Sequence, residues 1–190
     1  AKLGTAEMLG EYALALAIIT PVAMLSHLNL RAVLATDVDE RHAFGDYLAV
    51  RRVTTLGALA VIAVIAAFSR HSAVVGWAML LVGVSLSLDN ISDIYYGPLQ
   101  RSERMGCIAR SMIARGALSV TLFGAVLYVT RRLLPAVASM IVGRLLVLLL
   151  HDRPQGSAGQ RLERTGVGAQ WEIFRTALPL GVVLMLVSFT

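Results

Sequence analysis

Six long apolar stretches divide this chain, and they constrain its fold more than any other feature. A helix rises 1.5 Å per residue, so crossing the hydrocarbon core of a bilayer takes roughly 20 apolar residues. By this length we expect membrane-spanning helices over residues 9–34, 48–68, 73–97, 108–130, 133–151 and 171–190. The sequence therefore predicts an all-α fold, a polytopic transmembrane helix bundle with about six spans.

The overall composition agrees with a membrane protein and excludes other classes. Apolar residues make up 57% of the chain and charged residues 15%, whereas a soluble domain has about 45–50% and about 25%. The single cysteine, Cys107, excludes an intramolecular disulfide. The net charge of +5 comes from basic residues that lie between the apolar stretches. They form no single patch, so we expect membrane lipids as partners and no nucleic acid.

The distribution of basic residues orients the bundle. Loops alternate between the two sides of the membrane, and the cytoplasmic side carries the excess of Lys and Arg. Of the 17 basic residues, Arg144 lies within a helix and four fall on one side: Lys2, Arg70, Arg131 and Arg132. The other side receives Arg31, Arg41, Arg51, Arg52, Arg101, Arg104, Arg110, Arg115, Arg153, Arg161, Arg164 and Arg175. We expect this second side to be cytoplasmic, which places Ala1 outside.

The longest polar segment marks a boundary. "HDRPQGSAGQRLERTGVGAQ" is rich in Gly, Gln and charge, a composition typical of a linker. We expect residues 1–151 to hold the helices of an N-terminal lobe, 152–170 to be a cytoplasmic linker, and 171–190 to begin a C-terminal lobe. Because the chain starts without Met and stops within an apolar run, we expect a fragment. It would lack the first helix of the N-terminal lobe, and its last helix would be truncated.

The third span carries a polar face. Several polar residues recur there at three- and four-residue spacing, which places them on one side of a helix: Ser85, Asp89, Ser92, Asp93, Tyr96 and Gln100, with Asn90 beside them. Asp89 lies about 24 Å into the span, where an acidic group facing lipid costs about 2.5–3.5 kcal/mol. Two interpretations stay open. Asp89 makes an interhelical hydrogen bond while Asp93 lies at the interface, or the face lines an aqueous cavity.

Arg144, in "SMIVGRLLVLLL", is the second charge at membrane depth. It lies about 17 Å into its span, too deep for easy snorkelling to either end. It therefore faces inward under both interpretations that we consider. One is a structural ion pair, with Asp89 the first candidate partner; the other is a cationic cavity wall that attracts a phosphate or another anion.

The first span ends in "LSHLNLR", which adds His27 and Arg31 to the candidate cavity residues. A lone histidine is more often a hydrogen-bonded core or interface residue than a ligand. The sequence contains no metal-ligand cluster, GxSxG, Walker loop or HExxH. We therefore expect no metal, no catalytic residue and no enzymatic activity.

Several stretches resemble the Wzx-type polysaccharide flippases. "GEYALALAIITPVAMLSHLNLRAVLATD" is similar to their second helix, and "FGDYLAVRRVTT" resembles the entry to their third. "ISDIYYGPLQRSERMGCIARSMIARG" resembles the connection between helices four and five, and "WEIFRTALPLG" the start of helix seven. These flippases belong to the multidrug/oligosaccharidyl-lipid/polysaccharide (MOP) exporter superfamily. The resemblance implies part of a two-lobe MOP-type transporter with a central cavity.

The resemblance also implies a function. Such proteins flip undecaprenyl-pyrophosphate-linked oligosaccharide across the inner membrane by alternating access, for polysaccharide biosynthesis. The implied partners are the lipid-linked oligosaccharide and polysaccharide polymerase machinery. The resemblance implies no cofactor, and coupling to protons or sodium stays open. Arg144 and Asp89 are the residues that we carry over as substrate candidates.

Rival functions come from the same superfamily and from outside it. A MATE-like exporter of cations or drugs would use acidic cavity residues such as Asp89 and Asp93. A lipid II flippase would share the diphosphate chemistry. A membrane enzyme of polyprenyl metabolism would need a polar cluster such as "DVDERH", Asp37 to His42, which we interpret as a solvated turn. A purely structural subunit leaves Arg144 unexplained.

Overall fold

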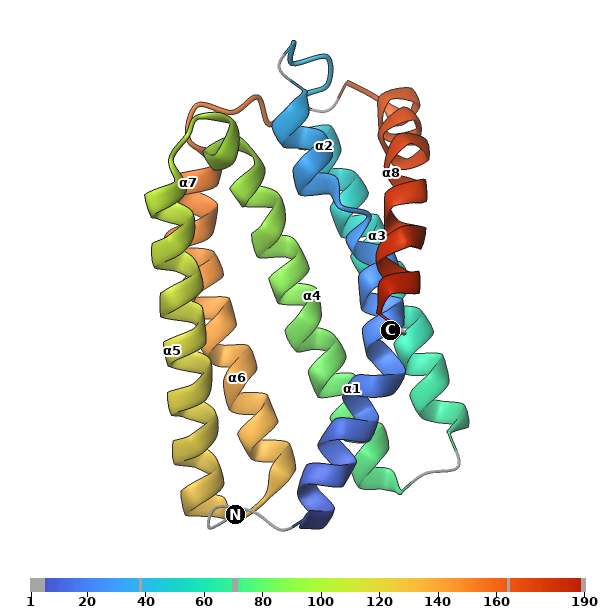
Figure 1. Ribbon diagram of the computed structural model, residues 1–190, viewed down its shortest axis with the longest axis vertical. Coiled ribbons are helices and arrows are strands. Elements are labelled where there is room, and N and C mark those ends of the chain that lie inside the picture. Colours follow the sequence, from blue (N-terminus) through green and yellow to red (C-terminus); the bar gives the residue numbers. More distant parts are fainter. Residues whose placement is uncertain (1–5, 38, 70–71, 164, 189–190) are drawn as a thin grey trace.

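The computed structural model describes residues 6–37, 39–69, 72–163 and 165–188, and this part of the chain is all-helical (Figure 1). The elements are α1 (Ala6–His27), α2 (Leu30–Thr36), α3 (Phe44–Phe68), α4 (Ala73–Arg101), α5 (Met105–Thr130), α6 (Leu133–Val147), the π-helical turn η1 (Leu148–Asp152), α7 (Arg153–Ser157) and α8 (Val167–Val187). Six helical segments are long and apolar enough to cross a membrane, with α1–α2 and α6–η1–α7 each counted as one. The predicted helix bundle is confirmed.

The helices extend beyond the predicted spans. Helix α3 begins at Phe44, whereas the span was predicted to begin at residue 48. The helix after Leu133 continues to Ser157, and α8 begins at Val167. Helices therefore extend into both ends of the predicted linker 152–170 and leave residues 158–166 between them, while the division into two lobes stays a prediction. Apolar length measures the lipid-facing part of a helix, whereas a polar helix end in water keeps its backbone hydrogen bonds.

The helices run up and down, so their connections gather at two ends (Figure 1). The α2–α3, α4–α5 and α7–α8 connections, with Arg41, Arg104 and Arg161, lie at one end. The α5–α6 connection with Arg131 lies at the other. This matches the predicted division of the loops, and the cytoplasmic location of the first end stays a prediction. Lys2, Arg70 and Arg164 lie outside the described residues.

The first span is broken near its C-terminal end. Leu28 and Asn29 take left-handed backbone conformations, with φ of 49° and 48°, and separate α1 from α2. Pro21 lies within α1, which continues past it. A helix end leaves its last carbonyl groups without intrahelical partners. The break therefore makes the carbonyls of Ser26 and His27 available to other side chains.

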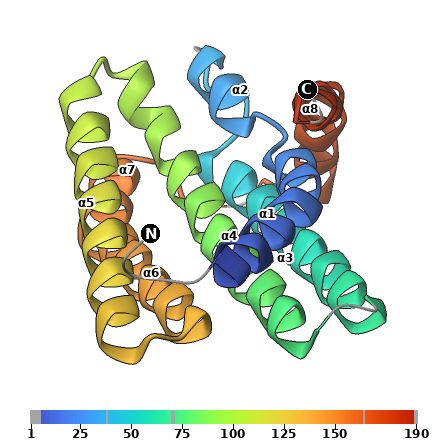
Figure 2. The ribbon, with the colours of Figure 1, turned by 60° about the horizontal axis from the view of Figure 1, so that its bottom comes forward.

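Helix α4 holds the bundle together. It packs against α1, α2 and α3 on one side and against α6 on the other, while α5 packs mainly on α6 (Figures 1 and 2). Helix α8 packs on α1 and α3. Gly181 permits the contact with α1, because a Cβ atom there would lie 2.8 Å from the Leu25 carbonyl oxygen. Small residues allow such close helix approach in membranes.

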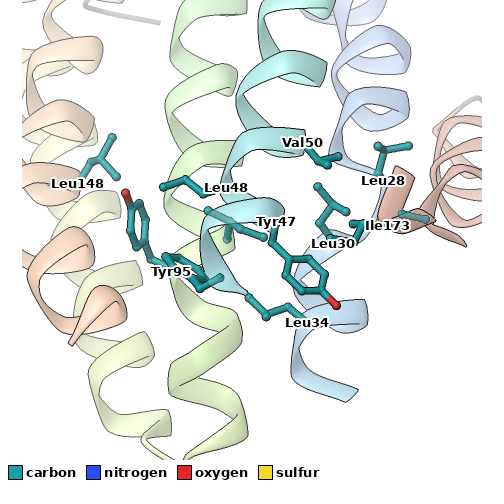
Figure 3. Close-up of a cluster of buried hydrophobic side chains, with 12 residues drawn as sticks. Leu28, Leu30, Leu34, Tyr47, Leu48, Val50, Tyr95, Leu148 and Ile173 are labelled. Atoms are coloured by element: carbon teal, nitrogen blue, oxygen red, sulfur yellow. The ribbon is translucent and has the colours of Figure 1, made fainter. Parts of the chain in front are cut away.

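An apolar cluster joins these helices near the end where α3 and α8 begin. Figure 3 shows Leu28, Leu30, Leu34, Tyr47, Leu48, Val50, Tyr95, Leu148 and Ile173 in this cluster. Its members come from the α1–α2 region, α3, α4, η1 and α8. Each of these side chains is at least nine-tenths buried. The packed cluster fixes the helices that carry the polar groups described next.

Candidate functional site

The polar face of α4 lies inside the bundle and carries two aspartates, one helical turn apart. Asp89 faces α5 and α6, because its partners there are Arg115 and Arg144. Asp93 faces α1, α2 and α3, where it meets His27, Arg31 and Arg51. Five of the six predicted candidates, Arg144, Asp89, Asp93, His27 and Arg31, therefore belong to two ionic clusters around α4.

The first cluster centres on Asp89. Its Oδ1 atom lies 3.1 Å from NH1 of Arg115, and its Oδ2 atom accepts a hydrogen bond from NH1 of Arg144. The Asp89 side chain is 28% exposed and that of Arg144 is 16% exposed. The structure thus brings together the two charges that the sequence placed at membrane depth. It also supplies a second cation, Arg115, which the sequence had not placed there.

Arg115 extends the first cluster toward the end of the bundle. Its NH2 group donates to the Tyr96 hydroxyl and lies 3.4 Å from Oδ2 of Asp152. Asp152 is fully buried and also accepts a hydrogen bond from Ser111, whose hydroxyl lies 2.6 Å from that of Tyr96. His151 Nδ1 is 3.4 Å from the same carboxylate. Asp152 was expected in a solvated linker, and the continued helix places it in the interior instead.

The second cluster centres on Asp93. His27 Nε2 lies 3.1 Å from Oδ2, Arg31 NH1 lies 3.3 Å from Oδ1, and Arg51 NH2 lies 3.9 Å from Oδ2. Arg31 also donates from Nε to Gln100 at 2.8 Å. Asp93 is 17% exposed, so this carboxylate lies within the bundle and not at an open interface.

Arg51, like Arg115, is absent from the site residues that the sequence predicts. Its side chain is fully buried, and NH1 donates to the carbonyls of Ser26 and His27 at 3.2 and 2.7 Å. These are the carbonyls released by the break after α1. The Nε and NH2 groups have no hydrogen-bond acceptor among the described residues. The signal was the charged "RR" near the start of the predicted span 48–68, which we had counted with the basic residues of the cytoplasmic side.

Asn90 lies beside the clusters without joining them. Its amide donates to the Ala23 carbonyl at 3.4 Å and to the Ser26 hydroxyl at 3.2 Å. These bonds tie α4 to α1. The structure therefore gives the Asn90 amide a role in helix packing.

Tyr96 connects the two clusters. The guanidinium carbon of Arg31 lies 5.6 Å from the centroid of the Tyr96 ring, and that of Arg115 lies 5.5 Å from it. Cation–π contacts of this kind stabilise by about 0.5–2 kcal/mol. The joined clusters hold four arginines and three aspartates: Arg31, Arg51, Arg115, Arg144, Asp89, Asp93 and Asp152. These seven side chains together carry one positive charge in excess.

The fold and the buried charges define a class. The chain is a multi-pass membrane protein with six apolar helices and an ionic network inside its bundle. Comparison with protein-family models, with curated proteins and with solved structures finds no match.

Proposed function

We propose that this chain is part of a membrane transporter that flips undecaprenyl-pyrophosphate-linked oligosaccharide across the inner membrane for polysaccharide biosynthesis. The observation that carries the proposal is the fully buried Arg51. Its Nε and NH2 groups have no hydrogen-bond acceptor among the described residues. Buried polar groups are normally hydrogen-bonded, so these two groups of Arg51 call for an acceptor from outside the chain.

A diphosphate headgroup fits this requirement. Its charges cannot enter hydrocarbon without replacement of their hydration. The planar guanidinium of arginine matches phosphate oxygens with two parallel donors, whereas lysine offers a point charge. Arg31 pairs with Asp93, as Arg51 does. Its side chain is 28% exposed, so a headgroup can reach it from outside the cluster. The polyprenyl chain can stay in lipid while the headgroup meets these arginines.

The pairing of the aspartates disfavours the rival exporter of cations or drugs. Asp89, Asp93 and Asp152 each have at least two basic side chains within 4.0 Å. A cationic substrate would have to displace these partners. A lipid II flippase would bind its diphosphate cargo with the same arginine chemistry. Lipid II therefore remains the alternative cargo.

The alternative function, a membrane enzyme of polyprenyl metabolism, depended on a polar cluster from Asp37 to His42. The Asp37 carboxylate already accepts hydrogen bonds within the chain. It accepts from the Tyr47 hydroxyl at 3.1 Å and from the backbone N–H groups of Arg41 and His42 at 3.2 and 3.4 Å. These bonds close a turn between α2 and α3. The segment thus has a local structural use that needs no substrate.

Binding of a defined probe tests the proposal. The chain in lipid nanodiscs is titrated with undecaprenyl pyrophosphate, and undecaprenol serves as the probe without phosphate. We expect Arg51→Gln to weaken binding of the pyrophosphate by about 10- to 100-fold, the usual value of hydrogen bonds to a charged group. Arg51→Lys should restore little of it. Arg52→Gln is the matched control, because the neighbouring Arg52 is exposed.

Two results would contradict the proposal. One is undecaprenol binding as tightly as the pyrophosphate, since the phosphate groups would then contribute nothing to the affinity. The other is equal weakening of pyrophosphate binding by Arg51→Gln and Arg52→Gln, which would mean that the basic surface attracts the pyrophosphate without a specific site. Both variants are compared at matched helix content by circular dichroism, so that a folding defect is not scored as lost binding.

A further inference from the structure

A fully buried carboxylate lies where the connection between α7 and α8 meets α3. Asp46 is in the first turn of α3, and its side chain has no exposed area. Both of its oxygens lie 3.1 Å from the backbone nitrogen of Thr165, and Oδ2 also accepts from the Thr165 hydroxyl. Gln170, in the first turns of α8, donates to Oδ1 at 3.4 Å. These side-chain bonds therefore join α3 to a segment about 120 residues later.

The backbone beside Asp46 adds a second attachment. The Gly45 N–H donates to the Arg161 carbonyl at 3.1 Å. A Cβ atom at Gly45 would lie 2.6 Å from the Glu163 carbonyl oxygen, a distance that real Cβ atoms do not show. Only glycine allows the two backbones to approach this closely. We call residues 158–163 and 165–166 the strap.

A third contact holds the strap near its start. Arg101, at the end of α4, donates to the Gln160 side chain at 3.4 Å and to Glu40 at 2.8 Å. The strap thus passes over the ends of α4 and α3 before it enters α8, as the path from α7 to α8 in Figure 1 shows. A segment attached at three points along so few residues cannot act as a flexible hinge.

Because Asp46 is buried, its carboxylate does more than interact with the dipole of α3: it attaches α3 to the strap. A carboxylate in the first turn of a helix gains about 0.3–1 kcal/mol from the helix dipole while it stays in water. Full burial costs hydration that only hydrogen bonds to the charged group can replace. For Asp46 these donors come from Thr165 and Gln170. The carboxylate is stable only while the strap and α8 stay in place.

We propose that Asp46 is a positioning residue that locks the strap and the start of α8 to α3, so that α8 moves with α3 as one unit. The sequence predicted a lobe boundary in this connection. On the present inference, relative motion takes place elsewhere, and the strap transmits the position of α3 to α8. The inference does not depend on which lipid the protein carries.

Limited proteolysis measures release of the strap. Arg161 is exposed, but trypsin needs a detached backbone to cleave after it. In membranes that present this end to the protease, we expect Asp46→Asn and Gly45→Ala to speed cleavage there at least about tenfold. Asp39→Asn and Gly57→Ala are the matched controls. Asp39 is largely exposed, and a Cβ at Gly57 would meet no atom within 4 Å.

Conservative variants at Thr165 distinguish the contribution of its hydroxyl from that of its backbone N–H, both of which donate to Asp46. Thr165→Ser keeps the hydroxyl that bonds Asp46, so cleavage should stay at the native rate. Thr165→Val keeps the backbone N–H alone, and its rate should lie between the native protein and Asp46→Asn. Native cleavage rates in both Asp46→Asn and Gly45→Ala would overturn the inference.

Spin-label distances distinguish positioning from general stabilisation. With Cys107 replaced by serine, labels at the exposed positions Val53 on α3 and Glu172 on α8 report the α3–α8 distance. Labels at Leu56 on α3 and Trp77 on α4 report a reference distance. We expect Asp46→Asn to broaden only the first distribution. Equal broadening of both would show that Asp46 stabilises the whole bundle, and the inference would be wrong.

Discussion

Replacing Asp89 by asparagine is expected to destabilise the bundle far more than replacing Arg144 by methionine, although the two residues form one ion pair. The asymmetry follows from Arg115, which shares the Asp89 carboxylate. Without Arg144, Asp89 keeps Arg115 at 3.1 Å. Without Asp89, Arg115 keeps Asp152, but Arg144 has no other carboxylate within 4.0 Å among the described residues.

The magnitude follows from burial. Removing one partner of a buried pair costs about 3–5 kcal/mol, and an exposed pair contributes about 0–1 kcal/mol. Arg144 is 16% exposed, so we expect about 2–4 kcal/mol for Asp89→Asn by interpolation between these limits. Arg144→Met should cost about 1 kcal/mol, because one charged hydrogen bond is lost and no carboxylate is left unpaired.

Reversible unfolding in mixed micelles measures these free energies, and the double variant completes the cycle. Asp89→Asn combined with Arg144→Met removes both the lone arginine and its partner, so stability should recover to within about 1 kcal/mol of the Arg144→Met variant. Equal destabilisation by the two single variants would refute the reasoning, since Arg115 would then give Asp89 no compensation. Failure of the double variant to recover would refute it as well.

Three further predictions follow from the same geometry. Tyr96→Phe should lower stability by about 1 kcal/mol, because it loses the hydroxyl bonds to Ser111 and Arg115 but keeps the ring; thermal unfolding checks this. Tyr96→Leu should cost about 0.5–2 kcal/mol more, because both cation–π contacts are lost; a cost equal to that of phenylalanine would contradict it. Cysteines at 41, 104 and 161 should resist an impermeant reagent in sealed cells while one at 131 reacts, and labelling at 161 would overturn the orientation.

The sequence predicted the helices well because apolar length is a strong signal, and it predicted the inward faces of Asp89 and Arg144 because charge at membrane depth is costly. It missed Arg115 for a physical reason. The predicted span 108–130 contains Arg115, but we counted this residue with the arginines of the cytoplasmic side. Helix α5 begins at Met105, so Arg115 lies about 15 Å inside the helix. Helix ends are set by hydrogen bonding in water as well as by lipid contact.

Two other parts of the site depend on backbone details that leave little trace in sequence. The break at Leu28 and Asn29 involves neither glycine nor proline, yet it releases the carbonyls that bind Arg51. The π-helical turn at the end of α6 continues the helix and buries Asp152. Both features arise from tertiary contacts, which override local preference.

Export per molecule in the Arg144→Met variant measures whether the buried arginines serve a lipid-linked diphosphate. Polysaccharide export is measured in cells that express the full-length protein and is divided by the amount of protein in the membrane. We expect near-normal abundance, because Asp89 keeps Arg115, together with loss of export that Arg144→Lys restores only slightly. Normal export per molecule in Arg144→Met would contradict the account and leave Arg144 with a structural role alone.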